Sequence, residues 1–187
     1  MNIQWAVLLA VLGCLMPSLP FLKAADTPPL PPPTNLRELT PQFQGIELLD
    51  RNGDTVLLDQ LFRREDNVVF AFFFTQCITL CTATTFAMKS IEAELPENTV
   101  LAMISIDPDN DTPEALSRYA EEHRLDAPRW RLLTGSKHAI ESTQKAMNSL
   151  RGNKMNHNAS LFVKKAGTGR YWEISDQFRK IPNMLEQ

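Results

Sequence analysis

The sequence predicts an α/β fold in which a central mixed sheet is flanked by helices and preceded by an N-terminal β-hairpin. Continuous apolar runs at residues 68–74 and 101–106 are typical of strands that are covered on both faces. The segments that follow them, 84–95 and 113–123, carry helical apolar spacing or helix-start signals. This alternation of strands and helices indicates an α/β sandwich whose sheet is partly parallel.

The first elements are an expected hairpin and the expected central strand. Residues 45–49 and 56–58 flank a turn at 50–53, where the Asn-Gly pair favours a tight reversal. The run VVFAFFF at 68–74 is the expected central strand. A helix is predicted over 84–95, ended by Pro96.

The remaining elements continue the alternation. A strand is expected at 101–106, and Thr112 as N-cap with Glu114 in the first turn predicts a helix over 113–123. A short strand at 130–133, a helix over 137–150, a hairpin of 161–163 with 171–174, and a closing helix over 176–185 complete the prediction.

The first 36 residues differ in composition from the rest. We predict that residues 1–25 are a signal peptide or an N-terminal membrane anchor, because an apolar run there is followed by prolines and small residues. Cys14 stands in VLGC, which resembles the sequence before a lipidated cysteine, and we interpret it as an apolar residue of that segment. Residues 26–36 form a proline-rich linker, and residues 37–187 one folded domain. The domain is therefore expected to be exported, to the periplasm or an equivalent intermembrane compartment, either free or anchored to the membrane.

Composition excludes one class of function. The formal net charge is -3, and Lys and Arg are scattered rather than gathered into the basic stripe that phosphate binding needs. We therefore expect no nucleic-acid partner. Proteins, small thiols and metal ions remain as the expected partners.

The strongest candidate site is the pair Cys77 and Cys81, at the end of the expected central strand. In α/β folds chemistry gathers where strands end and helices begin. Two thiolates four residues apart suit copper(I), and they equally suit disulfide exchange. If Cys81 lies at the start of a helix, the helix dipole should lower its thiol pKa. The cysteines alone leave both chemistries open.

Several blocks of the sequence resemble the Sco/SenC family. They are FFFTQCITLC, ISIDPDNDTPEALSRYA, LLTG and the His157 segment that leads into LFV, in the family's order between about Phe43 and Glu186. The resemblance implies a thioredoxin-like fold and copper bound by Cys77, Cys81 and His157. It also implies a metallochaperone that assists assembly of the Cu-A centre of cytochrome c oxidase or serves copper homeostasis, with the oxidase Cu-A subunit or another copper protein as its partner.

The sequence also departs from that family. Ile78 and Thr82 follow the cysteines where the family usually has proline, and Asn158 follows His157 where it usually has serine. The ligands are retained, so we expect a copper site of altered affinity and redox potential. The chain is similar to a divergent member of the family.

Two alternatives use the same cysteines. The chain could be a thiol-disulfide oxidoreductase acting through Cys77 and Cys81 on a partner protein, or a binding module in which they form a structural disulfide. His157 separates these hypotheses, because a reductase needs no imidazole from a distant segment. His123 and His138 are expected on helix surfaces. Met155 is a candidate auxiliary soft ligand, although a methionine in a polar loop is more often incidental.

A calcium site is not expected. Asp107, Asp109 and Asp111 imitate the opening of a calcium-binding loop. Thr112 and Arg118 stand where such a loop requires glycine and glutamate.

Overall fold

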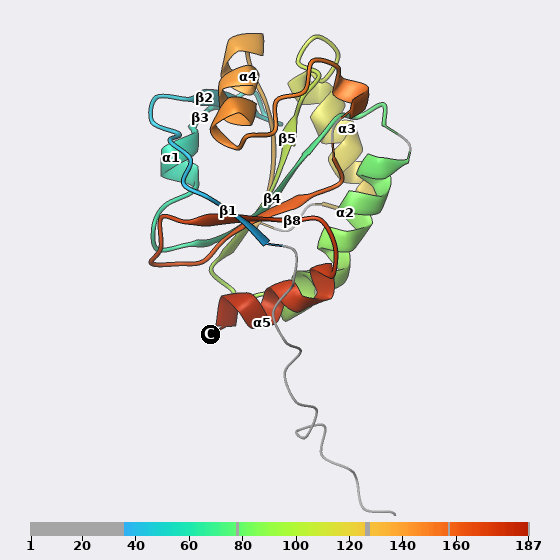
Figure 1. Cartoon of the computed structure of the whole chain (residues 1–187). Helices are drawn as coiled ribbons and strands as arrows, with labels where there is room; N and C mark the ends of the chain where they lie inside the picture. The colour runs from blue at the N-terminus through green and yellow to red at the C-terminus, as the bar shows by residue number, and fades with distance from the viewer. Residues whose placement is uncertain (1–35, 78, 126–127, 157, 187) are drawn as a thin grey trace, which may run out of the picture.

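A computed structural model describes residues 36–77, 79–125, 128–156 and 158–186 (Figure 1). The predicted signal peptide or anchor and all but the last residue of the predicted linker lie outside the described residues, and so does His157. Those assignments therefore stay predictions. Within the described ranges, no helix is long and apolar enough to cross a membrane.

The described chain contains strands, α-helices and short 3-10 helices in an alternating order. They are β1 (Leu36–Leu39), β2 (Glu47–Asp50), β3 (Thr55–Leu57), α1 (Leu58–Leu61), β4 (Asn67–Phe73), α2 (Leu80–Ile91), η1 (Glu92–Glu94), β5 (Thr99–Ser105), α3 (Pro113–His123), β6 (Trp130–Thr134), α4 (Lys137–Ala146), η2 (Lys154–Asn156), β7 (Leu161–Lys164), β8 (Tyr171–Ile174), η3 (Phe178–Lys180) and α5 (Ile181–Glu186).

The strands form one mixed sheet in the order β1-β8-β7-β4-β5-β6-β2-β3. β4, β5 and β6 are parallel to one another, whereas β7 joins β4 and β2 joins β6 in antiparallel fashion. β2 and β3 form the predicted hairpin, with Leu48 opposite Val56 and Gly53 in the turn at a φ of 85°. The predicted α/β class and mixed sheet are therefore confirmed.

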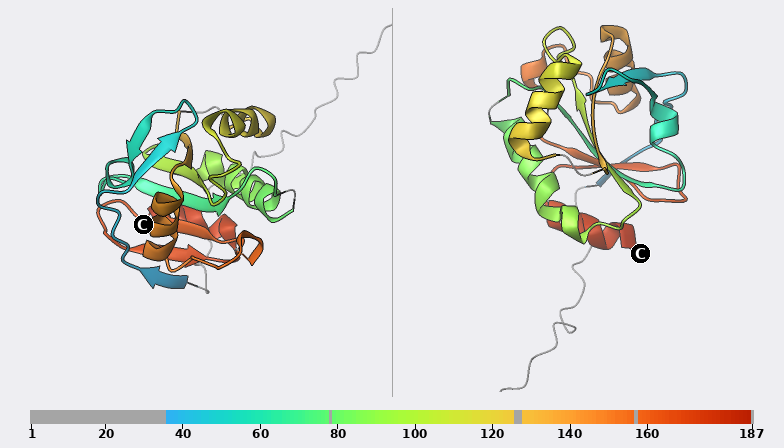
Figure 2. Two further views of the ribbon diagram at one scale, coloured as in Figure 1. Left: turned by 90° about the horizontal axis from the view of Figure 1, so that it is seen from above. Right: turned by 180° about the vertical axis from the view of Figure 1, so that it is seen from behind.

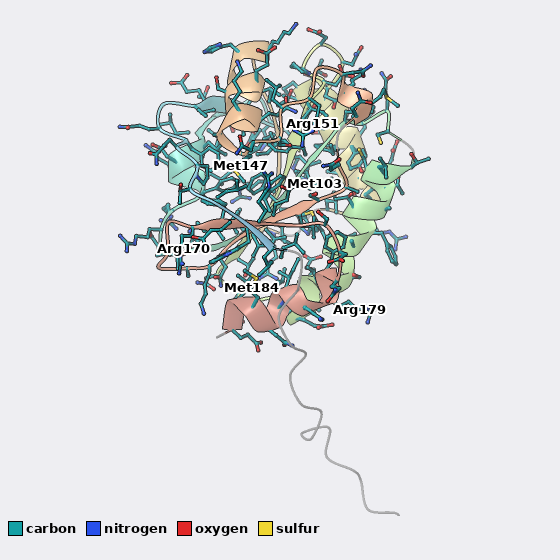
Figure 3. The ribbon with its side chains drawn as sticks, viewed as in Figure 1. Met103, Met147, Arg151, Arg170, Arg179 and Met184 are labelled. Atoms are coloured by element: carbon teal, nitrogen blue, oxygen red, sulfur yellow. The ribbon has the colours of Figure 1, made fainter. Side chains whose placement is uncertain are left out.

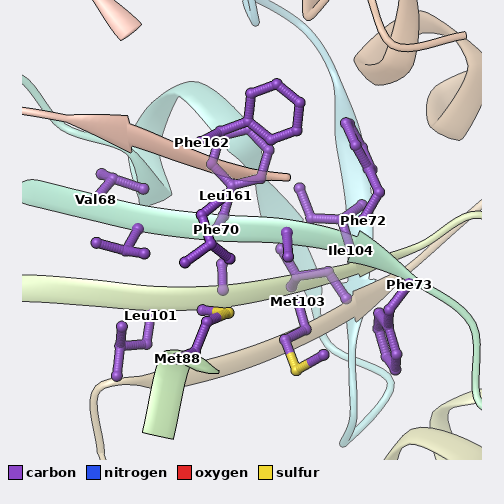
Figure 4. Packing of buried hydrophobic residues seen from close by; sticks show 14 of the residues in the cluster. Val68, Phe70, Phe72, Phe73, Met88, Leu101, Met103, Ile104, Leu161 and Phe162 are labelled. Atoms are coloured by element: carbon purple, nitrogen blue, oxygen red, sulfur yellow. The ribbon is translucent and has the colours of Figure 1, made fainter. Parts of the chain in front are cut away.

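β4 is the central strand, as its sequence predicts. All seven of its residues are buried, because both faces of the sheet are covered. Figure 4 shows Phe72 and Phe73 pointing to opposite faces. Phe70 stacks on Phe162 with ring centroids 4.9 Å apart, and Phe73 packs against Tyr119 at 5.0 Å. Aromatic contacts on both faces fix β4, and with it the start of the loop that follows.

Helices cover the two faces of the sheet. α2 and α3 lie next to each other on one side, and α1 and α4 lie on the other (Figures 1 and 2). Lys89 of α2 donates to the carbonyl of His123 at the end of α3 at 2.6 Å, and the hydroxyls of Thr85 and Tyr119 are 2.7 Å apart. These bonds fix α2 against α3, which gives the first turn of α2 a defined position above β4.

The boundaries of three predicted helices are wrong. α2 begins at Leu80 rather than at residue 84, because the turn after β4 is short, and it ends at Ile91 before a 3-10 turn. α4 ends at Ala146 rather than 150, and Asn148 then adopts a left-handed φ of 53°. The closing helix starts at Ile181, after η3. β1 and α1 were not predicted; both are only four residues long.

Candidate functional site

Cys77 and Cys81 lie where β4 passes into α2. Cys77 is in the connecting turn, and its N–H donates to the carbonyl of Phe74 at 3.1 Å. Cys81 is the second residue of α2, and its N–H donates to the Cys77 sulfur at 3.3 Å. Neither cysteine is in a disulfide. The strand-to-helix junction expected from the sequence is confirmed, and the Cys77 sulfur sits at the N-terminal end of α2.

The position of Cys81 at the start of a helix does not lower the pKa of its thiol. The residue is only 1% exposed. Burial raises the pKa of the Cys81 thiol well above its usual range, the hydrogen bond to Cys77 adds to the rise, and a backbone hydrogen bond with Phe74 only partly opposes it. The expectation of a lowered thiol pKa at Cys81 is therefore wrong, because loss of water around the sulfur outweighs the dipole.

The carboxyl group of Asp111 holds the turn before Cys77. Its side chain is fully buried, and it accepts the Thr75 N–H at 3.0 Å, the Thr75 hydroxyl at 2.5 Å and the Ser105 hydroxyl at 2.6 Å. Thr75 lies two residues before Cys77, and Ser105 is the last residue of β5. The Asp111 side chain thus joins the cysteine turn to the end of the neighbouring strand.

Lys154 joins a second, distant segment to the same end of the sheet. Its ammonium group is 2.5 Å from a carboxylate oxygen of Asp107, just after β5, and 5.3 Å from the ring centroid of Phe74. Asp107 also accepts the side-chain amide of Asn110 at 3.0 Å. Lys154 is on η2, three residues before His157. The segment that leads to His157 is therefore attached beside the cysteine turn.

The structure brings together two of the three predicted ligands, Cys77 and Cys81. His157 lies outside the described residues, so its approach to the sulfurs stays a prediction. Among the residues that are described, no three His, Cys, Asp or Glu side chains gather into a possible metal-ligand set. The three aspartates that imitate a calcium-binding loop are among the described residues that form no such set. The structure thus gives two soft sulfur donors at the junction.

The other residues singled out by the sequence lie mostly at the surface. His138 is exposed on α4, as expected. His123 was also expected on a helix surface, but it is half-buried, and its ring centroid lies 4.2 Å from that of Tyr119. Met155 is 65% exposed on η2.

A comparison with protein families decides what the chain is related to. The sequence model described as SCO1/SenC matches residues 35–182, which is most of the chain. The chain belongs to the SCO1/SenC family. The resemblance carried by FFFTQCITLC, ISIDPDNDTPEALSRYA and the other blocks is confirmed.

Individual relatives agree with this SCO1/SenC assignment. A putative copper-binding protein of Stutzerimonas stutzeri is 30% identical over 153 residues, which cover 78% of this chain and 70% of that protein. The SCO1 protein homolog of Bacillus subtilis is 28% identical over 97 residues, 50% of this chain and 49% of that protein. The match thus spans about half the length of the latter relative.

Solved structures of the family share the fold. BsSco, a member of the Sco family of cytochrome c oxidase assembly proteins with a disulfide switch, is 21% identical with a TM-score of 0.64, over 80% of this chain and 94% of that one. ScoI of Bradyrhizobium japonicum, with copper bound, is 18% identical with a TM-score of 0.60, over 75% of this chain and 95% of that one. The thioredoxin-like fold expected for this SCO1/SenC chain is therefore confirmed.

Sequence reasoning missed three supporting residues of this SCO1/SenC site: Thr75, Asp111 and Lys154. The sequence pattern marks Asp111 only as an imitation of a calcium ligand, although it lies in ISIDPDNDTPEALSRYA, one of the blocks that carry the resemblance. Thr75 and Asp111 are 36 residues apart, and Lys154 and Asp107 are 47 apart. No periodic pattern marks such pairs, since they meet only when the sheet forms.

Proposed function

We propose that this chain is a copper-binding metallochaperone whose ligands are Cys77, Cys81 and His157. It would serve assembly of the Cu-A centre of cytochrome c oxidase or copper homeostasis, with the Cu-A subunit or another copper protein as partner. One observation carries the proposal: two buried cysteines that are not in a disulfide lie one helical turn apart at the N-terminal end of α2. Family membership supports it.

The chemistry of the two sulfurs suits copper. Soft thiolates favour copper(I) over the hard cations that prefer oxygen. The thiols must lose their protons when the metal binds. Because burial keeps the Cys81 thiol protonated in the metal-free protein, copper competes with a proton there, and affinity should rise with pH. Burial of both sulfurs also limits access of water and of other thiols to the metal.

The place of Lys154 supports His157 as the third ligand. Lys154 contacts Asp107 and Phe74, and Phe74 accepts a hydrogen bond from Cys77. These contacts hold η2, the described segment just before His157, beside the cysteine turn. An imidazole is a common copper ligand and would complete a low-coordinate site.

The test is titration of the reduced full-length chain with copper(I) and copper(II). A Cys14→Ser background leaves Cys77 and Cys81 as the remaining thiols. We expect His157→Ala to weaken copper binding and to change the sulfur-to-copper charge-transfer spectrum, whereas the matched variant His138→Ala, on the exposed face of α4, should change neither. Unchanged affinity and spectrum in His157→Ala would exclude the three-ligand site.

Thiol-disulfide exchange on a partner protein is the second candidate, because the two neighbouring cysteines are not in a disulfide and could form one. Burial argues against fast exchange, since the attacking species is a thiolate and the Cys81 thiol has a raised pKa. The reduction potential and the rate of exchange with glutathione decide between the two. Fast exchange at an oxidising potential would favour the reductase, whereas slow exchange would favour the copper protein.

Cellular location follows from the N-terminal sequence rather than from the described fold. We infer export, with residues 1–25 as a signal peptide or membrane anchor and residues 26–36 as the linker to the domain. Cell fractionation of the full-length chain tests this inference. Recovery in the cytoplasmic fraction would contradict it.

A further inference from the structure

A cavity of about 160 Å³ lies between α4 and two loops beside the carboxyl end of β5. Its first wall is one stripe of α4, formed by Lys137, Ile140, Glu141 and Gln144. The second wall is the loop at 106–109, directly after β5, and the third comes from the segment 150–154. The ion pair of Lys154 with Asp107 joins the last two walls. In α/β folds, crevices outside the carboxyl ends of strands commonly bind ligands.

Gln144 presents an unused amide group to this cavity. The residue is only 7% exposed, and its side chain forms no hydrogen bond with any residue that the structure describes. The amide keeps contact with the open space of the cavity rather than being sealed in the core. A buried amide without a partner costs free energy of folding, so such a group calls for an explanation. A ligand in the cavity supplies one, because it can bond to the N–H groups or the carbonyl oxygen of the amide.

The lining of the cavity carries charges of both signs in equal number. The cations are Lys137, Arg151 and Lys154, and the carboxylates are Asp107, Asp109 and Glu141. Lys154 and Asp107 already neutralise each other. Lys137 and Asp109 form no ion pair within the described ranges. The guanidinium of Arg151 (Figure 3) donates to main-chain carbonyls of its own loop, which leave its charge uncompensated. Both a positive and a negative charge therefore remain for a ligand.

The volume of the cavity limits the size of its ligand. Drug-sized molecules occupy pockets of about 300–1,000 Å³. A water molecule takes about 30 Å³, so the cavity has room for about five or six non-hydrogen atoms. A lone anion would meet the carboxylates of the lining, and a lone cation would meet its ammonium and guanidinium groups. A small molecule that carries both charges suits the lining better than either.

We propose that this cavity binds a small zwitterion of the amino-acid class. Its carboxylate pairs with Lys137 or Arg151, and its ammonium group pairs with Asp109. One of its charged groups also forms a hydrogen bond with the Gln144 amide. The apolar part of the lining, which a short alkyl side chain can cover, includes Ile106, Ile140 and Leu150. The site uses neither cysteine, so it is independent of the proposed copper site.

The first test is titration of the full-length chain with glycine and L-alanine, which match the cavity in size. We expect saturable binding, seen as a shift of the Gln144 side-chain amide signal in NMR spectra and as a rise in the thermal midpoint. Acetate and methylammonium carry only one of the two charges and should bind at least about tenfold more weakly. Acetate binding as tightly as glycine would overturn the zwitterion. Absence of saturable binding by glycine and L-alanine would overturn the site.

Gln144→Met separates a ligand-binding amide from a structural one. The variant keeps the length of the side chain and removes its polar atoms. Glycine binding should weaken about tenfold or more, because a hydrogen bond to a charged group is lost. The thermal midpoint of the ligand-free variant should stay unchanged or rise, because the amide has no bond to lose among the described residues. A lower midpoint together with unchanged glycine binding would show a structural amide and overturn the proposal.

The cations of the lining have a matched control elsewhere on the surface. Lys137→Met and Arg151→Met should each weaken glycine binding about two- to fivefold, since charges that water reaches contribute modestly. Arg179 is an exposed cation on η3, and Figure 3 shows it at the opposite end of the molecule from Arg151. Arg179→Met should leave binding unchanged. Equal losses in Arg151→Met and Arg179→Met would show that net charge, not the cavity, determines binding, and would overturn the assignment.

Discussion

Polar side chains near the ends of β4 and β5 shape the cysteine turn. Asp111 is the clearest case, because three donors from two segments point at one fully buried carboxyl group. A buried polar group of this kind adds little net stability while it is satisfied. Its removal leaves one buried and two half-buried donors without this acceptor, and an unsatisfied buried donor costs about 1–3 kcal/mol.

We therefore expect Asp111→Ala to destabilise the protein by about 3 kcal/mol. The loss leaves the Thr75 N–H and the Thr75 and Ser105 hydroxyls without this acceptor. Urea unfolding followed by tryptophan fluorescence measures it. Asp109→Ala is the matched control: Asp109 is exposed in the same loop, so the change should stay within about 0.5 kcal/mol. Equal losses in the two variants would contradict the role given to Asp111.

At the scale of elements, α3 and α4 begin at side-chain caps. Thr112 accepts the N–H of Ala115 at 3.3 Å at the start of α3, and Ser136 accepts that of Ala139 at 3.1 Å at the start of α4. α2 differs, because its N-cap residue Thr79 makes no side-chain capping bond. At the start of α2 the sulfur of Cys77 accepts a helix N–H instead.

We expect Thr112→Ala to lower the free energy of unfolding by about 1 kcal/mol, since it removes the α3 cap. Thr112→Ser keeps the hydroxyl and should stay close to the parent protein. Chemical denaturation of the two variants side by side measures the difference. Equal stability of the alanine and serine variants would show that the cap contributes nothing.

These caps also explain what the sequence could predict. Thr112 followed by Pro113 and Glu114 is a local signal, so the bounds of α3 were predicted correctly. The continuous apolar run likewise predicted β4. The start of α2 was placed four residues late, because its capping acceptor is a cysteine sulfur and no local polar signal marks it. Cys77 and Cys81 were predicted from motif spacing, whereas Asp111 and Lys154 depend on contacts between distant segments.

At the scale of the whole molecule, the core holds ionisable groups on both sides of the sheet. The chain has two tyrosines, and both are buried, Tyr119 on α3 and Tyr171 on β8. Burial raises the pKa of Tyr119 to about 12, although its hydrogen bond with Thr85 acts in the opposite direction. Burial raises the pKa of Tyr171 further above its usual range. Neither group can ionise readily until the fold opens.

Stability should therefore fall in alkaline solution. An unfolded tyrosine has a pKa of about 10. A group whose pKa is raised by folding contributes full stability below its unfolded pKa and loses it as the pH rises toward the folded pKa. At about pH 11 the unfolded chain has released both phenolic protons while the folded protein retains them, which costs about 1 kcal/mol for each tyrosine. Burial of Cys81 acts in the same direction.

Urea unfolding at about pH 8 and about pH 11 measures this loss, and the ultraviolet absorbance of tyrosinate reports ionisation directly. In the folded protein the tyrosinate signal should be nearly absent at the higher pH and should appear together with unfolding. Tyr171→Phe removes one of the two groups, so about half of the tyrosine-dependent loss should disappear. If tyrosinate forms while the fold remains intact, or if Tyr171→Phe leaves the pH dependence unchanged, burial of the two phenols does not control the alkaline limit of the fold.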